Sequence, residues 1–290
     1  MDNNNELTIK KIIIYLIVLF WIQLGVGVLV GVVSFIIYTI LNPNTPANEI
    51  SKLIASSNLL NVLYIFIGEF IFLIAALIIK NKYKNTFNNE LSLKNLDILM
   101  ILYILIFSLS FVILSSEIEN IVASFIGRMS SLNQSITNVS QIPNTKGLIL
   151  SIITIGILPA FIEEFLFRGL IQKNLSKKYG NTKAIIITSI MFALFHLNPT
   201  VILSIFLLSL MLGYVYSKTN KIIYPIILHF FNNIIVVIII RYNTFEIKGI
   251  NTSLDKIEHV SPYILLPALI IIFLISYIIY KTKFVTSNDD

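Results

Sequence analysis

The sequence predicts an all-α, polytopic membrane protein with about eight transmembrane helices. Of its 290 residues, 56% are hydrophobic and 12% are charged, whereas a soluble domain carries about 25% charged residues. The mean hydropathy is +0.87. Apolar runs long enough for a membrane-spanning helix recur along the chain, while the strands of a membrane barrel would be about ten residues long with alternating polarity.

Eight apolar segments follow one another, and each is expected to form one helix. The segments are residues 12–41, 57–79, 98–115, 147–171, 184–197, 199–217, 222–240 and 262–280. The fifth is short for a full span, and Asn198 followed by Pro199 is expected to end its helix. The Ser- and Asn-rich stretch 116–146 is expected to lie at the outer surface.

The basic residues predict the orientation of these helices. Fourteen of the 21 Lys and Arg residues flank the first segment, fill the second, fourth and sixth loops, or follow the last segment. Only six lie in the alternate loops. The richer side is cytoplasmic by the positive-inside rule. We therefore expect a multi-pass protein of the cell membrane with both termini in the cytosol.

Composition excludes several classes of function. The net charge of +6 is spread over loops on one side of the membrane, so we predict no nucleic-acid partner. Cysteine is absent, which excludes disulfides, thiolate catalysis and Cys-ligated metals. Heavy use of Ile, Asn and Lys is typical of AT-rich coding and points to a bacterial source.

The fourth segment carries three ionisable residues, Glu163, Glu164 and Arg168, in an otherwise apolar stretch. Each charge at the centre of a spanning helix costs about 2.5–3.5 kcal/mol if it is unpaired. Glu164 and Arg168 are four residues apart, so an ion pair on one helix face is expected. Such a pair by itself would fix helix register, but it leaves Glu163 unexplained. Glu69, in the second segment, is another buried carboxyl and has no motif around it; it either pairs with a cation or is protonated.

Two further polar elements follow. His196 ends the fifth segment, and His229 and Asn233 share one face of the seventh. Taken singly, such residues more often hold helices together through hydrogen bonds. At 1.5 Å per residue, the polar groups fall in one layer of the cytosolic half, with His196 the deepest. We predict a shared cavity among helices 4, 5 and 7.

At this point the chain resembles a known family. EEFLFR at 163–168, FALFH at 192–196 and HFFNN at 229–233 are similar to the EExxxR, FxxxH and HxxxN elements of the CPBP family. That family includes the type II CAAX prenyl endopeptidases and the bacterial Abi and bacteriocin-processing or self-immunity membrane proteases. The resemblance covers about 155–235. It divides the chain into N-terminal helices and an outer loop, 1–145, and a catalytic core of helices 4–8, 146–290.

The resemblance implies an intramembrane-type endopeptidase that acts on a membrane-associated peptide or protein. Glu163 would be the general base for a water held with His196, and that water would attack the substrate carbonyl. His229 and Asn233 would stabilise the oxyanion. Glu164 with Arg168 would hold the geometry. The lipid bilayer is the other expected partner, and the oligomeric state is left open.

Three alternatives remain at this stage. We predict no cofactor, although Glu163, His196 and His229 are acceptable zinc ligands and a zinc-dependent variant stays open. A non-catalytic immunity or adaptor protein of the same fold would use the polar cluster to bind a partner. An ion-coupled transporter is the third, because buried Glu, Arg and His also mark proton paths, but no internal repeat supports it.

Overall fold

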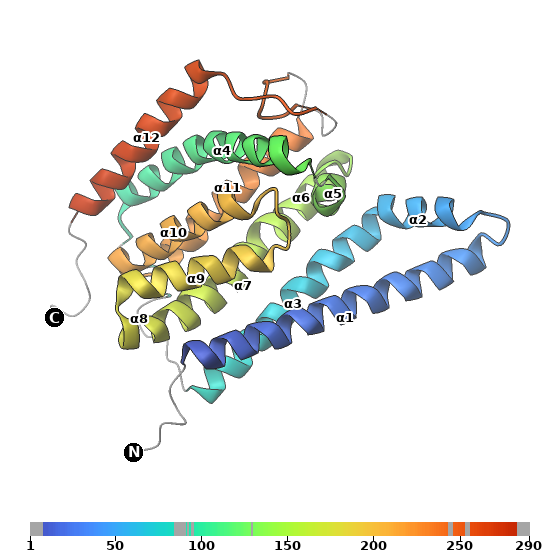
Figure 1. The fold of residues 1–290 in the computed structure, drawn as a ribbon, viewed down its shortest axis with the longest axis horizontal. Helices are drawn as coiled ribbons and strands as arrows, with labels where there is room; N and C mark the ends of the chain where they lie inside the picture. The colour runs from blue at the N-terminus through green and yellow to red at the C-terminus, as the bar shows by residue number, and fades with distance from the viewer. Residues whose placement is uncertain are drawn as a thin grey trace.

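The computed structural model describes residues 8–83, 91, 93, 96–128, 130–242, 246–252 and 256–282, and no strand occurs among them. The chain folds into a bundle of helices (Figure 1). The elements are α1 (Ile9–Leu41), α2 (Ala47–Ser56), α3 (Asn58–Lys82), α4 (Ile98–Ile126), α5 (Ser130–Ser140), α6 (Asn144–Ser151), η2 (Ile152–Ile157), α7 (Leu158–Glu164), η3 (Phe165–Gln172), α8 (Lys173–Tyr179), α9 (Asn181–Phe195), α10 (Ile202–Thr219), α11 (Ile223–Arg241) and α12 (Pro262–Lys281). The labels η2 and η3 denote π-helical segments.

Each of the eight predicted apolar segments corresponds to helix. Seven helices of the described chain are long and apolar enough to cross a membrane, and the continuous span Asn144–Tyr179 contains α6 through α8. The fifth predicted segment forms α9, which has only 15 residues, as its short apolar run predicted. The prediction of an all-α, polytopic protein is confirmed, and the chain is a multi-pass membrane protein.

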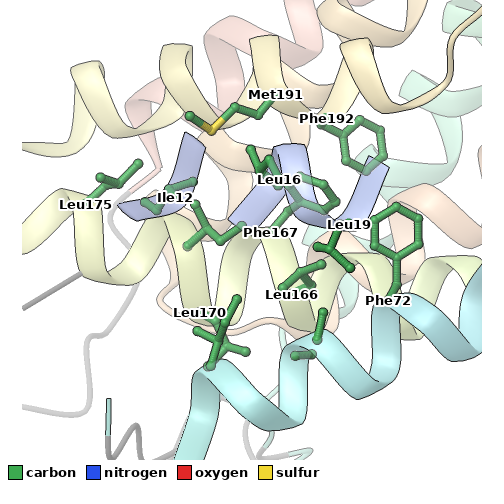
Figure 2. Close-up of a cluster of buried hydrophobic side chains, with 14 of the residues drawn as sticks. Ile12, Leu16, Leu19, Phe72, Leu166, Phe167, Leu170, Leu175, Met191 and Phe192 are labelled. Carbon is green, nitrogen blue, oxygen red and sulfur yellow. The ribbon is translucent and has the colours of Figure 1, made fainter. Parts of the chain in front are cut away.

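The N-terminal helices pack against the helices that carry the motifs. Figure 2 shows side chains of α1, α3, η3, α8 and α9 in one apolar cluster. Phe167 of η3 lies at its centre, with its ring centroid 6.1 Å from that of Phe72 and 5.1 Å from that of Phe192. A second cluster joins α4, α10, α11 and α12. Residues 1–145 and 146–290 therefore share a core, and their division into two domains stays a prediction.

The stretch 116–146, predicted as an outer loop, is largely helical. It contains the last turns of α4, all of α5 and the start of α6. Polar side chains in the last turns of α4 form hydrogen bonds or ion pairs with other parts of the chain, which favours continuation of the helix. Glu117 lies 2.8 Å from Nδ1 of His259, and Glu119 accepts a hydrogen bond from the hydroxyl of Ser204.

The start of α1, the α8–α9 turn and the end of α12 lie toward the same side of the bundle, at the left in Figure 1. Contacts between helix ends agree: the Tyr15 and Tyr83 hydroxyls are 3.0 Å apart, and Lys218 donates to the Tyr280 carbonyl. Lysines thus gather at one end, as the charge bias predicted. Lys84, Lys94, Lys283 and both chain ends lie outside the described residues, so the cytosolic placement of the termini stays a prediction.

Close approach of η3 and α10 depends on Gly213. The side-chain amide of Gln172 donates to the Gly213 carbonyl at 2.8 Å. A Cβ at position 213 would lie 2.7 Å from Oε1 of Gln172 and 3.2 Å from Cγ2 of Ile185. An added methyl group would therefore require the side chains of Gln172 and Ile185 to shift.

Gly213→Ala is expected to lower the free energy of unfolding by about 1–3 kcal/mol, the usual cost of overpacking a well-packed site. Thermal unfolding of the detergent-purified protein measures the effect. Gly27→Ala is the matched control, because no atom lies within 4 Å of a Cβ there and alanine is the better helix former. Equal melting temperatures for Gly213→Ala and wild type would contradict this account of the contact.

Candidate functional site

The two adjacent glutamates lie between two interruptions of regular helix. Glu163 and Glu164 end α7, with the π-helical segment η2 before it and η3 after it. Segments of π-helix are rare and frequently occur at functional sites. Pro159 has no N–H to donate to the carbonyl four residues earlier, that of Ile155. Asn233 of α11 supplies a donor instead, through its side-chain amide at 2.9 Å.

A buried ion pair anchors the site. Arg168 Nη1 lies 2.9 Å from Glu164 Oε1, and both side chains are 0% exposed, so the pair expected from the four-residue spacing is present. Arg168 Nη2 donates to both the carbonyl and the hydroxyl of Ser209 on α10. The guanidinium also lies 4.7 Å from the ring centroid of Phe192 on α9. Arg168 thus joins three elements around Glu164.

His229 connects the ion pair to the second glutamate. Its Nδ1 lies 3.0 Å from Glu164 Oε1, and its Nε2 lies 4.0 Å from Glu163 Oε2. The Glu164 carboxylate also accepts from Arg168 and can only accept while ionised, so His229 Nδ1 carries the hydrogen. The ring is therefore oriented with its other nitrogen toward Glu163.

His196 and Asn233 lie near the glutamates and His229, but in the described part of the chain their side chains form hydrogen bonds with backbone carbonyls. His196 follows α9, is exposed, and its Nδ1 lies 3.0 Å from the Phe192 carbonyl. The Phe192 ring contacts both imidazoles, with centroids 5.0 Å from that of His196 and 5.8 Å from that of His229. Among the described residues, no hydrogen bond or ion pair joins His196 to Glu163. Asn233 has one amide hydrogen engaged with Ile155, which leaves its second for another acceptor.

The arrangement brings Glu163, Glu164, Arg168 and His229 into one buried network and places His196 beside it through Phe192. A cavity shared by helices 4, 5 and 7, with His196 on the same water as Glu163, stays a prediction. Among the described residues, Oε2 of Glu163 is buried and has no hydrogen-bond partner, and the same is true of Oε2 of Glu164. A buried polar atom without a partner is costly and calls for an explanation.

Sequence reasoning missed several residues that support the network. Ser209 and Gln172 are buried partners of the η3–α10 contact, but serine and glutamine in a helix are too common to be signals by themselves. Phe192 was visible only as the first letter of a motif. Glu69 is a buried carboxyl with no motif around it, so the sequence indicates no partner for it.

The absence of a cofactor stays a prediction. Within the described part of the chain, no group of three or more His, Cys, Asp and Glu side chains is placed to hold one. The zinc alternative named Glu163, His196 and His229 as ligands. Of these, Glu163 and His229 face each other, while His196 directs its Nδ1 to a backbone carbonyl.

Comparison with known proteins supports the resemblance of the motifs. Residues 145–235 match the family model described as type II CAAX prenyl endopeptidase Rce1-like. Searches of curated proteins and of solved structures found no match. The matched segment spans α6 to α11 and holds every residue of the three motifs. In these helices the chain matches the Rce1-like type II CAAX prenyl endopeptidase family, as its motifs predicted.

Proposed function

We propose that the protein is an intramembrane-type endopeptidase in which Glu163 activates a water to hydrolyse a peptide bond. The observation that carries the proposal is the buried network of Glu163, His229, Glu164 and Arg168, which lies inside the segment that matches an endopeptidase family. A structural ion pair needs only Glu164 and Arg168. It does not account for a second buried carboxyl facing an oriented imidazole.

The contacts of the network support the following roles. Glu163 takes one proton from the water while the water oxygen attacks the substrate carbonyl carbon. The same proton later passes from Glu163 to the leaving amine. Glu164, itself held by Arg168, orients the His229 ring toward Glu163. The free amide hydrogen of Asn233 donates to the oxyanion, and so does the Nε2–H of His229 when its imidazole is protonated. Such a donor is typically worth about 3–4 kcal/mol. His196 helps to hold the water from the α9 side.

The substrate class is a membrane-associated peptide or protein whose scissile bond reaches the depth of Glu163. We further propose that the protein lies in the cell membrane with both termini in the cytosol, since the lysine-rich helix ends gather at one side of the bundle. The buried network then lies in the cytosolic half of the bilayer. A substrate would reach it from the cytosol or along the membrane plane.

A peptide-library experiment tests the proposal. Detergent-purified wild type and Glu163→Ala are incubated with the same library, and cleavage positions are mapped by mass spectrometry. Wild type should cut at a shared sequence feature, and the variant should lose those cuts. Equal cleavage by both proteins would overturn the assignment of Glu163. No cleavage by wild type, with an unchanged cellular phenotype for Glu163→Ala, would instead favour a non-catalytic protein.

Metal independence is part of the proposal and makes its own prediction. Because the described donors do not gather as a metal site and Glu163 supplies the base, dialysis against a strong chelator should leave the cleavage rate unchanged. A zinc protease treated in parallel controls for complete chelation. Loss of cleavage that added Zn²⁺ restores would contradict the prediction.

A further inference from the structure

Glu69 is a buried carboxyl that the proposed mechanism has not used. It lies in the middle of α3 and is 7% exposed, and the residues that precede and follow it in the sequence are apolar. It is outside the segment 145–235 that matches the endopeptidase family. A carboxyl at this depth of a spanning helix is costly, so it is expected to have a specific partner.

That partner is Glu163. Among the described residues, Oε2 of Glu69 and Oε2 of Glu163 are both buried without a hydrogen-bond partner, the two side chains interact electrostatically, and α3 packs directly on α7. Among the described residues, Glu69 makes no ion pair with a Lys, Arg or His. A carboxylate only accepts hydrogen bonds, so two carboxyl groups can bond only if one of them carries a hydrogen. The contact thus requires a proton held between the two side chains.

The arrangement extends the network by one member. From α3 to α10, the order is Glu69, Glu163, His229, Glu164, Arg168 and Ser209. At one end Arg168 forms an ion pair with Glu164. At the other end, no Lys or Arg among the described residues forms an ion pair with Glu69 or Glu163, and two negative charges on neighbouring groups in a low-dielectric interior repel strongly. One shared proton removes that repulsion.

We propose that Glu69 is a positioning residue that shares a proton with Glu163 and holds the carboxyl of this base toward His229. Its catalytic consequence rests on the proposed endopeptidase function. When Glu163 acts as base, the hydrogen lies on Glu69, which donates to the Glu163 carboxylate. The helices before residue 145, which carry no family motif, then supply a residue on which the site depends.

Two variants of similar volume separate the proton-sharing role from packing. Glu69→Leu fills the space but donates nothing, and it is expected to lower kcat about 10- to 100-fold with KM little changed, the equivalent of one charge-assisted hydrogen bond. Glu69→Gln keeps a donor for the Glu163 carboxylate and should retain most of kcat. Glu119→Gln, at a half-buried carboxyl of α4 that accepts from Ser204, is the matched control and should be unchanged. Wild-type kcat in Glu69→Leu, or equal losses in the Leu and Gln variants, would overturn the proposal.

Infrared spectroscopy tests the shared proton without any substrate. The carbonyl stretching band of protonated carboxyl groups is compared in wild type, Glu69→Gln, Glu163→Gln and the double variant. Because the two groups share one proton, each single substitution should alter the same carbonyl band. The double variant should lose no more band intensity than one protonated carboxyl group contributes. Independent, additive changes, like those expected for Glu119→Gln combined with Glu163→Gln, would refute the pairing. This result holds even if no peptide is cleaved, an outcome that would reject the protease function alone.

Discussion

Arg168→Ala is expected to destabilise the protein by about 3–5 kcal/mol, because it leaves the Glu164 carboxylate buried and without its cation. The carbonyl and hydroxyl of Ser209 also lose their donor. Thermal unfolding in detergent, together with the yield of monodisperse protein, measures the loss. A variant as stable as wild type would show that the pair contributes little and would contradict this expectation.

Two further variants separate charge, geometry and packing at this position. Arg168→Lys keeps a cation, but a lysine ammonium lacks the planar set of donors with which the guanidinium binds Glu164 and Ser209 together. The stability of this variant should therefore lie between those of wild type and Arg168→Ala. Combining Glu164→Leu with Arg168→Met replaces the ion pair by apolar groups of similar volume, which is often neutral or stabilising. We expect that double variant to regain stability but not peptide cleavage, because His229 then lacks the carboxylate that orients it.

Glu163→Gln is expected to reduce kcat by about 10²- to 10⁴-fold, the usual contribution of a general base, while the melting temperature stays at or above that of wild type. The amide has the shape of the carboxyl but cannot take a proton, and it removes a negative charge from a cluster that already holds Glu164. Steady-state kinetics on the best peptide of the library, with melting curves for each variant, make the measurement.

Glu164→Gln is the matched comparison for this result. The two glutamates are neighbours, but only Glu164 is bound to Arg168, so its replacement should lower stability as well as activity. Glu163→Gln should lower activity alone. If both variants lost stability equally and kept measurable cleavage, Glu163 would be a structural residue and the proposed mechanism would be wrong.

Much of this protein followed from local sequence. Eight apolar runs predicted eight helices, because backbone groups in the lipid interior must form hydrogen bonds within the protein. In the described chain, seven helices are long and apolar enough to cross a membrane, and the fifth run forms a shorter helix. The Glu164–Arg168 pair followed from a spacing that places both side chains on one helix face. Both predictions depend on neighbours in the chain. The helical end of α4 did not follow from local sequence, because its last turns contact residues far away in the chain, such as Ser204 and His259.

The tertiary structure alone decided which polar groups meet. The sequence placed Glu163, His229 and Asn233 in neighbouring helices. It did not indicate the contact of His229 with Glu164 or that of Asn233 with the Ile155 carbonyl, nor that α3, which carries Glu69, packs on α7. Those contacts depend on the rotation and depth of each helix in the bundle. Rotation and depth are set by packing such as that of Phe167 and Gly213, for which hydropathy and periodicity carry no signal.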